Sequence, residues 1–153
     1  MAGGTGSRSR EQTMPEELPE RLEPGTVNVP GIAGLTAGME YIQKTGLSNI
    51  FQREHHAAER CICDLRELGM TVYSGPHQAA TVSFVPPVDC EIITQKLADR
   101  GIAVRSGLHC APLAHESVGT LDTGTVRVSF GHNAHPWQSR MLKKNLIQIL
   151  ESC

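Results

Sequence analysis

The chain has 153 residues, near the usual size of one domain and too short for two ordinary ones. Apolar residues make up 39% and charged residues 20%, which is typical of a globular protein and excludes an intrinsically disordered one. The formal net charge of −2 excludes the basic excess of a dedicated nucleic-acid binder, and no apolar run is long enough to cross a membrane. The 5 cysteines form an odd number and no signal peptide precedes them, so we expect free thiols and a cytoplasmic protein.

The first part of the chain differs in character from the rest. Residues 1–30 carry repeated glycine and proline without a helical or strand period, and we expect an extended arm there, followed by one folded domain over 31–153. The stretch Gly3-Gly4-Thr5-Gly6-Ser7 offers backbone N–H groups and hydroxyls that suit an anion. A flexible terminus is the alternative interpretation of so short a motif.

Hydrophobic periodicity predicts four helices and four short strands in the second part. The expected helices cover 31–46, 50–68, 90–99 and 136–150, and the expected strands cover 71–73, 81–85, 102–104 and 125–130. Asp89 can cap the helix that starts at Cys90, and Pro136 is well placed at the first position of the last helix. These elements predict a small α/β domain, in which three or four strands form one sheet and the helices lie mostly on one face.

The predicted loop over 106–124 contains the best candidate for chemistry. Cys110 stands in the run Arg105-Ser106-Gly107-Leu108-His109-Cys110-Ala111-Pro112, where Arg105 and His109 are cationic neighbours that would favour the nucleophilic thiolate. The alternative is a small, buried and inert cysteine in a turn.

Arg127 is the second candidate. Val126 and Val128 flank it in a predicted strand, so the alternation places Arg127 on the opposite face from both. A planar guanidinium suits two-point binding of a carboxylate, and a solvated surface position is the alternative.

The cysteines and histidines do not predict a metal site. Cys61 and Cys63 point in different directions on a predicted helix, and His109, Cys110 and His115 have no second ligand pair at zinc spacing.

Several motifs together resemble one enzyme family. The segment from Arg105 to Pro112 resembles the active-site cysteine segment of the cysteine desulfurase and selenocysteine lyase family, which belongs to the class V aminotransferases. The strand around Arg127 is similar to the family's substrate-arginine strand, and Asn133 follows where the family has an aromatic-Asn-Thr turn, although His132 and Ala134 depart from that pattern. The glycine-rich stretch resembles the loop that reaches the cofactor phosphate of the neighbouring subunit.

The resemblance implies the C-terminal domain of a fold-type I pyridoxal phosphate (PLP) enzyme. It implies a homodimer that takes sulfur from L-cysteine, releases alanine and leaves a persulfide on Cys110, from which an acceptor protein could receive the sulfur. Arg127 would bind the substrate carboxylate, with Arg105 and Asn133 as further substrate contacts. Gly4 and Thr5 would bind the phosphate of the partner subunit's PLP.

The family's PLP-binding lysine has no counterpart in the sequence. Lys44, Lys96, Lys143 and Lys144 all fall on predicted helices without the family's histidine-lysine context. We therefore expect the C-terminal part of such an enzyme, inactive by itself. Two alternatives stay open: another class V enzyme, such as a selenocysteine lyase, aminotransferase or epimerase, and a non-catalytic thiol or sulfur-acceptor module.

Overall fold

The computed structural model describes residues 2–4, 6, 8 and 10–152, and the chain divides into two compact units, Met1–Gly46 and Leu47–Cys153. The first unit holds a short 3₁₀ helix, η1 (Glu20–Leu22), and helix α1 (Val29–Thr45). Asn28 caps α1, because its side chain accepts a hydrogen bond from the backbone N–H of Gly31 at 3.0 Å. Gly46 ends the helix with a φ of 84°, a left-handed value that glycine adopts without strain.

The apolar side chains of α1 are exposed. The sequence correctly predicts this helix, but none of its described residues is buried, and Ile32, Leu35 and Met39 are each exposed by half or more. Within the first unit, α1 therefore shows an apolar surface that no described residue covers.

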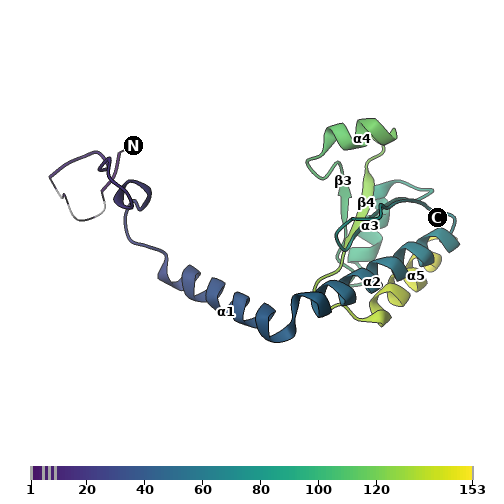
Figure 1. Cartoon of the computed structure of the whole chain (residues 1–153). Coiled ribbons are helices and arrows are strands. Elements are labelled where there is room, and N and C mark those ends of the chain that lie inside the picture. Colours follow the sequence, from purple (N-terminus) through teal and green to yellow (C-terminus); the bar gives the residue numbers. More distant parts are fainter. Residues whose placement is uncertain (1, 5, 7, 9, 153) are drawn as a thin grey trace. The chain divides into compact units, whose positions relative to one another are not determined.

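The second unit is built around one antiparallel sheet of four strands (Figure 1). Its strands are β1 (Thr71–Tyr73), β2 (Thr81–Val85), β3 (Arg105–Gly107) and β4 (Thr125–Ser129), in the spatial order β1-β2-β4-β3. The helices of this unit are α2 (Leu47–Glu67), α3 (Cys90–Ala98), α4 (Pro112–Val118) and α5 (Pro136–Glu151).

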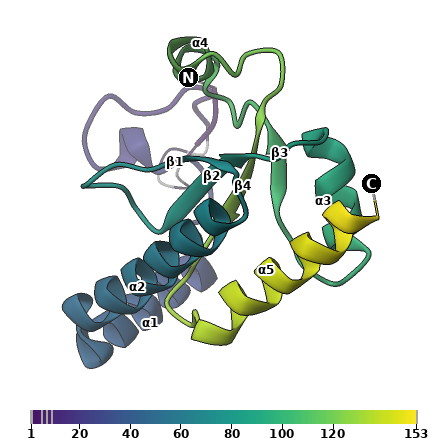
Figure 2. The same cartoon turned by 90° about the vertical axis from the view of Figure 1, so that its right-hand side faces the viewer.

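Helices α2, α3 and α5 cover one face of the sheet, and α4 lies beyond the ends of β3 and β4 (Figure 2). Alternate strand residues, Val82 and Phe84 on β2 and Val126 and Val128 on β4, point into the core. From the helices the core receives Cys61 and Leu65 of α2, Ile93 and Leu97 of α3, and Leu142, Leu146 and Ile149 of α5. The predicted α/β class, with helices mostly on one face, is confirmed.

Two predicted elements are wrong. The strand expected over 102–104 lies instead at Arg105–Gly107, because Ile102 and Val104 pack against the core without pairing their backbone to β4. The predicted loop over 106–124 contains α4, which begins at Pro112, a residue well suited to the first turn of a helix. Apolar composition marked the burial of 102–104 but not the strand pairing.

A polar connection joins α2 to α5. The Ser139 hydroxyl donates to the Asp64 carboxylate at 2.6 Å, and Lys143 forms ion pairs with Asp64 and Glu67. The hydrogen bond to Glu67 raises the pKa of Lys143, so this lysine stays protonated. Among the described residues, no helix combines the length and apolar character that crossing a membrane requires.

Candidate functional site

Cys110 stands at the tip of a tight turn on the chain between β3 and α4. The N–H of Ala111 donates to the carbonyl of Leu108 at 2.9 Å, and the two central residues, His109 and Cys110, have φ values of 52° and 59°. Positive φ at both central positions is typical of a type I′ turn, where glycine and asparagine are preferred. Each such residue costs on the order of 1 kcal/mol or more, so neighbouring contacts must hold the turn. Cys110 is exposed there as a free thiol.

The turn is held against the first residues of β4. The Nε2 atom of His109 lies 3.2 Å from the carbonyl oxygen of Thr125 and 3.1 Å from its hydroxyl. Directly beside this contact, Gly107 and Gly124 approach so closely that a Cβ on Gly124 would lie 2.9 Å from the Gly107 Cα. The missing side chain of Gly124 therefore lets the two backbones meet here.

A second histidine packs on the first. The rings of His109 and His115 have centroids 5.9 Å apart and are tilted by 44°. His115 is buried on α4, and its Nδ1 lies 2.8 Å from the hydroxyl of Thr120, which is also buried. The N–H of Thr120 donates to the carbonyl of His115 at 2.9 Å, so backbone and side chain both fix this pair.

His109 is a neutral ring at pH 7, which corrects its expected role as a cationic neighbour of Cys110. Burial lowers its pKa most, and the charges of Arg127, His115 and Arg105 lower it further, against an opposing hydrogen bond with Thr125. A carbonyl only accepts, so its contact with Thr125 assigns the hydrogen to Nε2. The Nδ1 atom then carries a lone pair, and it is buried without a partner among the described residues.

Arg127 lies in the middle of β4 on the face away from the helices. In the strand register it stands directly opposite Ser83 of β2 and Arg105 of β3. Like charges in directly opposite positions destabilise a sheet unless an anion lies between them. The Nε atom of Arg127 is buried and has no hydrogen-bond partner among the described residues. The half-buried guanidinium therefore suits a carboxylate ligand rather than a solvated surface role.

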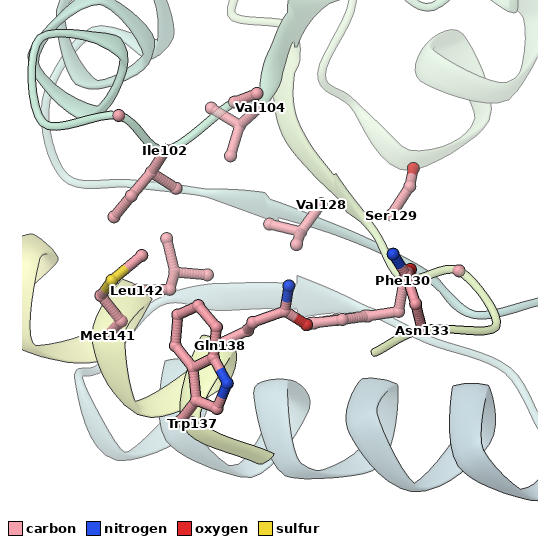
Figure 3. A pocket seen from close by; sticks show the side chains of 13 residues that line it. Ile102, Val104, Val128, Ser129, Phe130, Asn133, Trp137, Gln138, Met141 and Leu142 are labelled. Atoms are coloured by element: carbon pink, nitrogen blue, oxygen red, sulfur yellow. The ribbon is translucent and has the colours of Figure 1, made fainter. Parts of the chain in front are cut away.

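The structure does not bring Asn133 to this cluster. Asn133 follows the far end of β4, where it lines an open pocket of about 330 Å³ with Trp137 and Gln138 of α5 (Figure 3). Trp137 and Met141 of α5 are exposed by 52% and 37% and border this pocket. Its walls are otherwise mostly apolar.

The remaining predicted site residues lie elsewhere. Gly4 belongs to the first unit, where its carbonyl accepts from the N–H of Gly25 at 2.8 Å, and Thr5 lies outside the described residues. Cys61 is buried and Cys63 exposed on α2. In the part of the chain that the structure describes, no three His, Cys, Asp or Glu side chains gather as metal ligands would.

Sequence reasoning did not assign roles to Thr120, Thr125, His115 and Ser83. Strand alternation alone places Thr125 on the face of Arg127, and pairing of the two strands would have added Ser83. Nothing in the local pattern of Thr120 indicates its contact with His115.

Comparisons with known proteins give one consistent answer. The family model described as "Aminotransferase class-V" matches residues 1–137. A probable cysteine desulfurase of Pyrococcus abyssi is 37% identical over 140 residues, which are 88% of this chain and 33% of that protein. A cysteine desulfurase of Synechococcus elongatus is 42% identical over 108 residues, covering 66% of this chain and 17% of that protein.

Solved structures agree with these relatives. The apo structure of a cysteine desulfurase from Thermococcus onnurineus has a TM-score of 0.80 and 33% identity, covering 94% of this chain and 36% of that one. A cysteine desulfurase of Escherichia coli has a TM-score of 0.74 and 27% identity, covering 88% of this chain and 33% of that one. The chain thus spans about a third of the length of these proteins.

We predict that Gly124→Ala destabilises the second unit by about 2–4 kcal/mol, since it adds a backbone clash to the strain of a left-handed residue. Gly101→Ala is the matched control, because Gly101 also has a positive φ, 74°, but open space at its Cβ position. Urea unfolding of both variants makes the comparison. Equal losses of stability would show that the contact between Gly107 and Gly124 does not hold the turn.

We predict that His109 titrates below the ordinary histidine pKa of about 6.5. Because the folded pKa is lowered, the stability that the neutral ring contributes is present above pH 6.5 and is lost as the pH falls through the folded value. Arg127→Gln should raise the pKa of His109, whereas Arg140→Gln, on α5, should leave it unchanged. NMR titration of the imidazole signals measures the pKa of His109 in both variants. An unchanged His109 midpoint in Arg127→Gln would contradict the effect of the Arg127 charge on His109.

Proposed function

The chain belongs to the class-V aminotransferase family, and from this premise we propose that it is the C-terminal part of a PLP-dependent cysteine desulfurase. Its substrate is L-cysteine, its product is alanine, and its sulfur is left as a persulfide on Cys110. One observation carries this proposal: an exposed thiol stands on a strained turn next to His109, on which the charge of Arg127 acts, and the buried Nε of Arg127 has no partner among the described residues. Strain that is maintained beside an unsatisfied donor is typical of a functional site.

Each residue of the cluster has a distinct task in this proposal. Arg127 binds the substrate carboxylate, and Arg105, directly opposite on β3, adds a second positive charge to the same anion. The Cys110 thiolate then attacks the substrate sulfur, forming an S–S bond while the C–S bond breaks. The electron pair of the broken bond passes to the alanine fragment, which takes up a proton.

PLP, when bound, supplies the electron sink for that pair. The described residues fit only its phosphate end. Gly4 is exposed and has no side chain to block a phosphate, and we propose that Gly4 and Thr5 contact the phosphate of PLP in the partner subunit of a homodimer. They do not fit its attachment point, since the lysines lie on α1, α3 and α5, and Lys143 is held in ion pairs.

The proposal also concerns the source of the PLP-binding lysine, the sulfur acceptor and Asn133. The attachment lysine would come from polypeptide that corresponds to the part of the relatives that this chain does not match, so we expect no turnover of cysteine by residues 1–153 alone. An acceptor protein would take the sulfur from exposed Cys110 in the cytoplasm. A substrate contact by Asn133 stays a prediction, because this residue lies at the other end of β4.

A pair of alkylating reagents tests whether a carboxylate is drawn to Cys110. Iodoacetate carries a carboxylate and iodoacetamide does not, so the ratio of their labelling rates reports the local anion site. We predict a ratio at least about fivefold higher at Cys110 than at Cys63, which is an exposed thiol on α2. Peptide-resolved mass spectrometry measures both thiols in one sample.

Arg127→Gln should bring the ratio at Cys110 down to that at Cys63, and Arg140→Gln should not change it. Equal ratios at the two thiols in the unmodified chain would count against a carboxylate site beside Cys110.

A chimera tests the activity itself. The segment of the Pyrococcus abyssi relative that matches this chain is replaced by residues 1–153, and release of alanine from L-cysteine is measured. We predict desulfuration that Cys110→Ser reduces by at least about a hundredfold, whereas Cys63→Ser leaves it unchanged. A Cys110→Ser chimera that binds PLP and keeps its activity would refute the role of Cys110. Assays with selenocysteine as a second substrate distinguish a selenocysteine lyase from a cysteine desulfurase.

A further inference from the structure

Two buried atoms near the cysteine turn lack a hydrogen-bond partner among the described residues: Nδ1 of His109, an acceptor, and Nε of Arg127, a donor. The described part of the chain contains three buried side-chain atoms without a partner: Oγ1 of Thr94 on α3, Nδ1 of His109 and Nε of Arg127. The last two are close enough for the charge of Arg127 to lower the pKa of His109. A buried polar atom left unpaired costs about 1–3 kcal/mol. One ligand that carries both an anion and a hydrogen donor would satisfy both atoms.

The lone pair of His109 is held in a fixed direction. Its Nε2–H is committed to Thr125, whose carbonyl and hydroxyl both lie within 3.2 Å. The ring also packs on His115, which Thr120 fixes from α4. These two contacts, from β4 and from α4, leave Nδ1 as the hydrogen-bonding atom of the ring that is buried without a partner among the described residues.

The groups around His109 favour the neutral form of its ring, which accepts a hydrogen bond at Nδ1. Charged or titratable groups reach His109 from each neighbouring element: Arg105 on β3, Arg127 on β4 and His115 on α4. All three disfavour an imidazolium, and none of the carboxylates that the structure describes acts on the ring. A neutral nitrogen with a lone pair accepts a hydrogen bond from a neutral donor such as a thiol.

We propose that His109 contacts the substrate directly: its Nδ1 accepts the thiol hydrogen of an amino acid whose carboxylate is bound by Arg127. This inference rests on the proposed function and adds the feature that selects a thiol. His109 directly precedes Cys110 in the same turn, so the proposed thiol contact and the attacking sulfur belong to neighbouring residues. The contact orients the substrate sulfur and involves no proton transfer.

Two small carboxylates test the contact on the full chain by NMR. 3-Mercaptopropionate and propionate share the carboxylate and differ in the thiol, which is protonated at pH 7. With a reductant present, both probes should shift the Nε signal of Arg127, and only 3-mercaptopropionate should shift the Nδ1 signal of His109. We expect His109→Phe to weaken binding of 3-mercaptopropionate about three- to tenfold, the value of one hydrogen bond, without changing binding of propionate.

The matched control is His56→Phe, the same substitution at an exposed position of α2, which should change neither affinity. If both probes shift Arg127 and neither shifts His109, the inference is overturned while the proposed carboxylate site stands. If neither probe shifts Arg127, the carboxylate site fails and the inference fails with it. The comparison of the two probes on the unmodified chain decides the matter even if His109→Phe does not fold.

Discussion

The pairing of β3 with β4 is the constraint on which the candidate site depends. Its register places Arg105 opposite Arg127 and Gly107 opposite Thr125, and the cysteine turn follows directly from Gly107. The backbones can approach this closely at this end because Gly124 has no Cβ, which would lie 2.9 Å from the Gly107 Cα. A slip of one residue would turn Arg127 into the core and move Val126 and Val128 to the open face, so core packing and site geometry enforce the same register.

The site combines several features that each lower the stability of the fold. Two residues in left-handed conformations, a like-charged pair across two strands and two unsatisfied buried atoms occur within one sheet edge and one turn. The core on the other face, with Phe84, Leu146 and Ile149 fully buried, supplies stability that tolerates these costs. Concentration of such costs in one place is what a binding site for an anionic ligand requires, because the ligand relieves them.

The fold and the two main site residues could be predicted from sequence because they depend on local patterns. Alternation in 125–130 placed Arg127 opposite the core face, and the neighbouring Arg105 and His109 marked Cys110 as a candidate. The remainder depends on contacts between distant residues. His109 was expected to be cationic, but burial and the charges of Arg127 and Arg105 lower its pKa, and the position of β3 could not be read from Ile102 and Val104, which are apolar without being paired. Asn133 is close to Arg127 in sequence, but it lies past the opposite end of β4.

The division of tasks within the cluster explains why a cysteine and a histidine occupy a turn that favours glycine and asparagine. In this turn His109 packs against β4 and α4, whereas the adjacent Cys110 is exposed at the tip. In the proposed function His109 would accept from the ligand and Cys110 would attack it, and the contacts with Thr125 and His115 keep the ring in place. Glycine at either position would relieve the strain and remove a reacting or recognising group. The strained backbone is therefore a consequence of placing two functional side chains side by side, and the short links to β4 and α4 are what keep it in place.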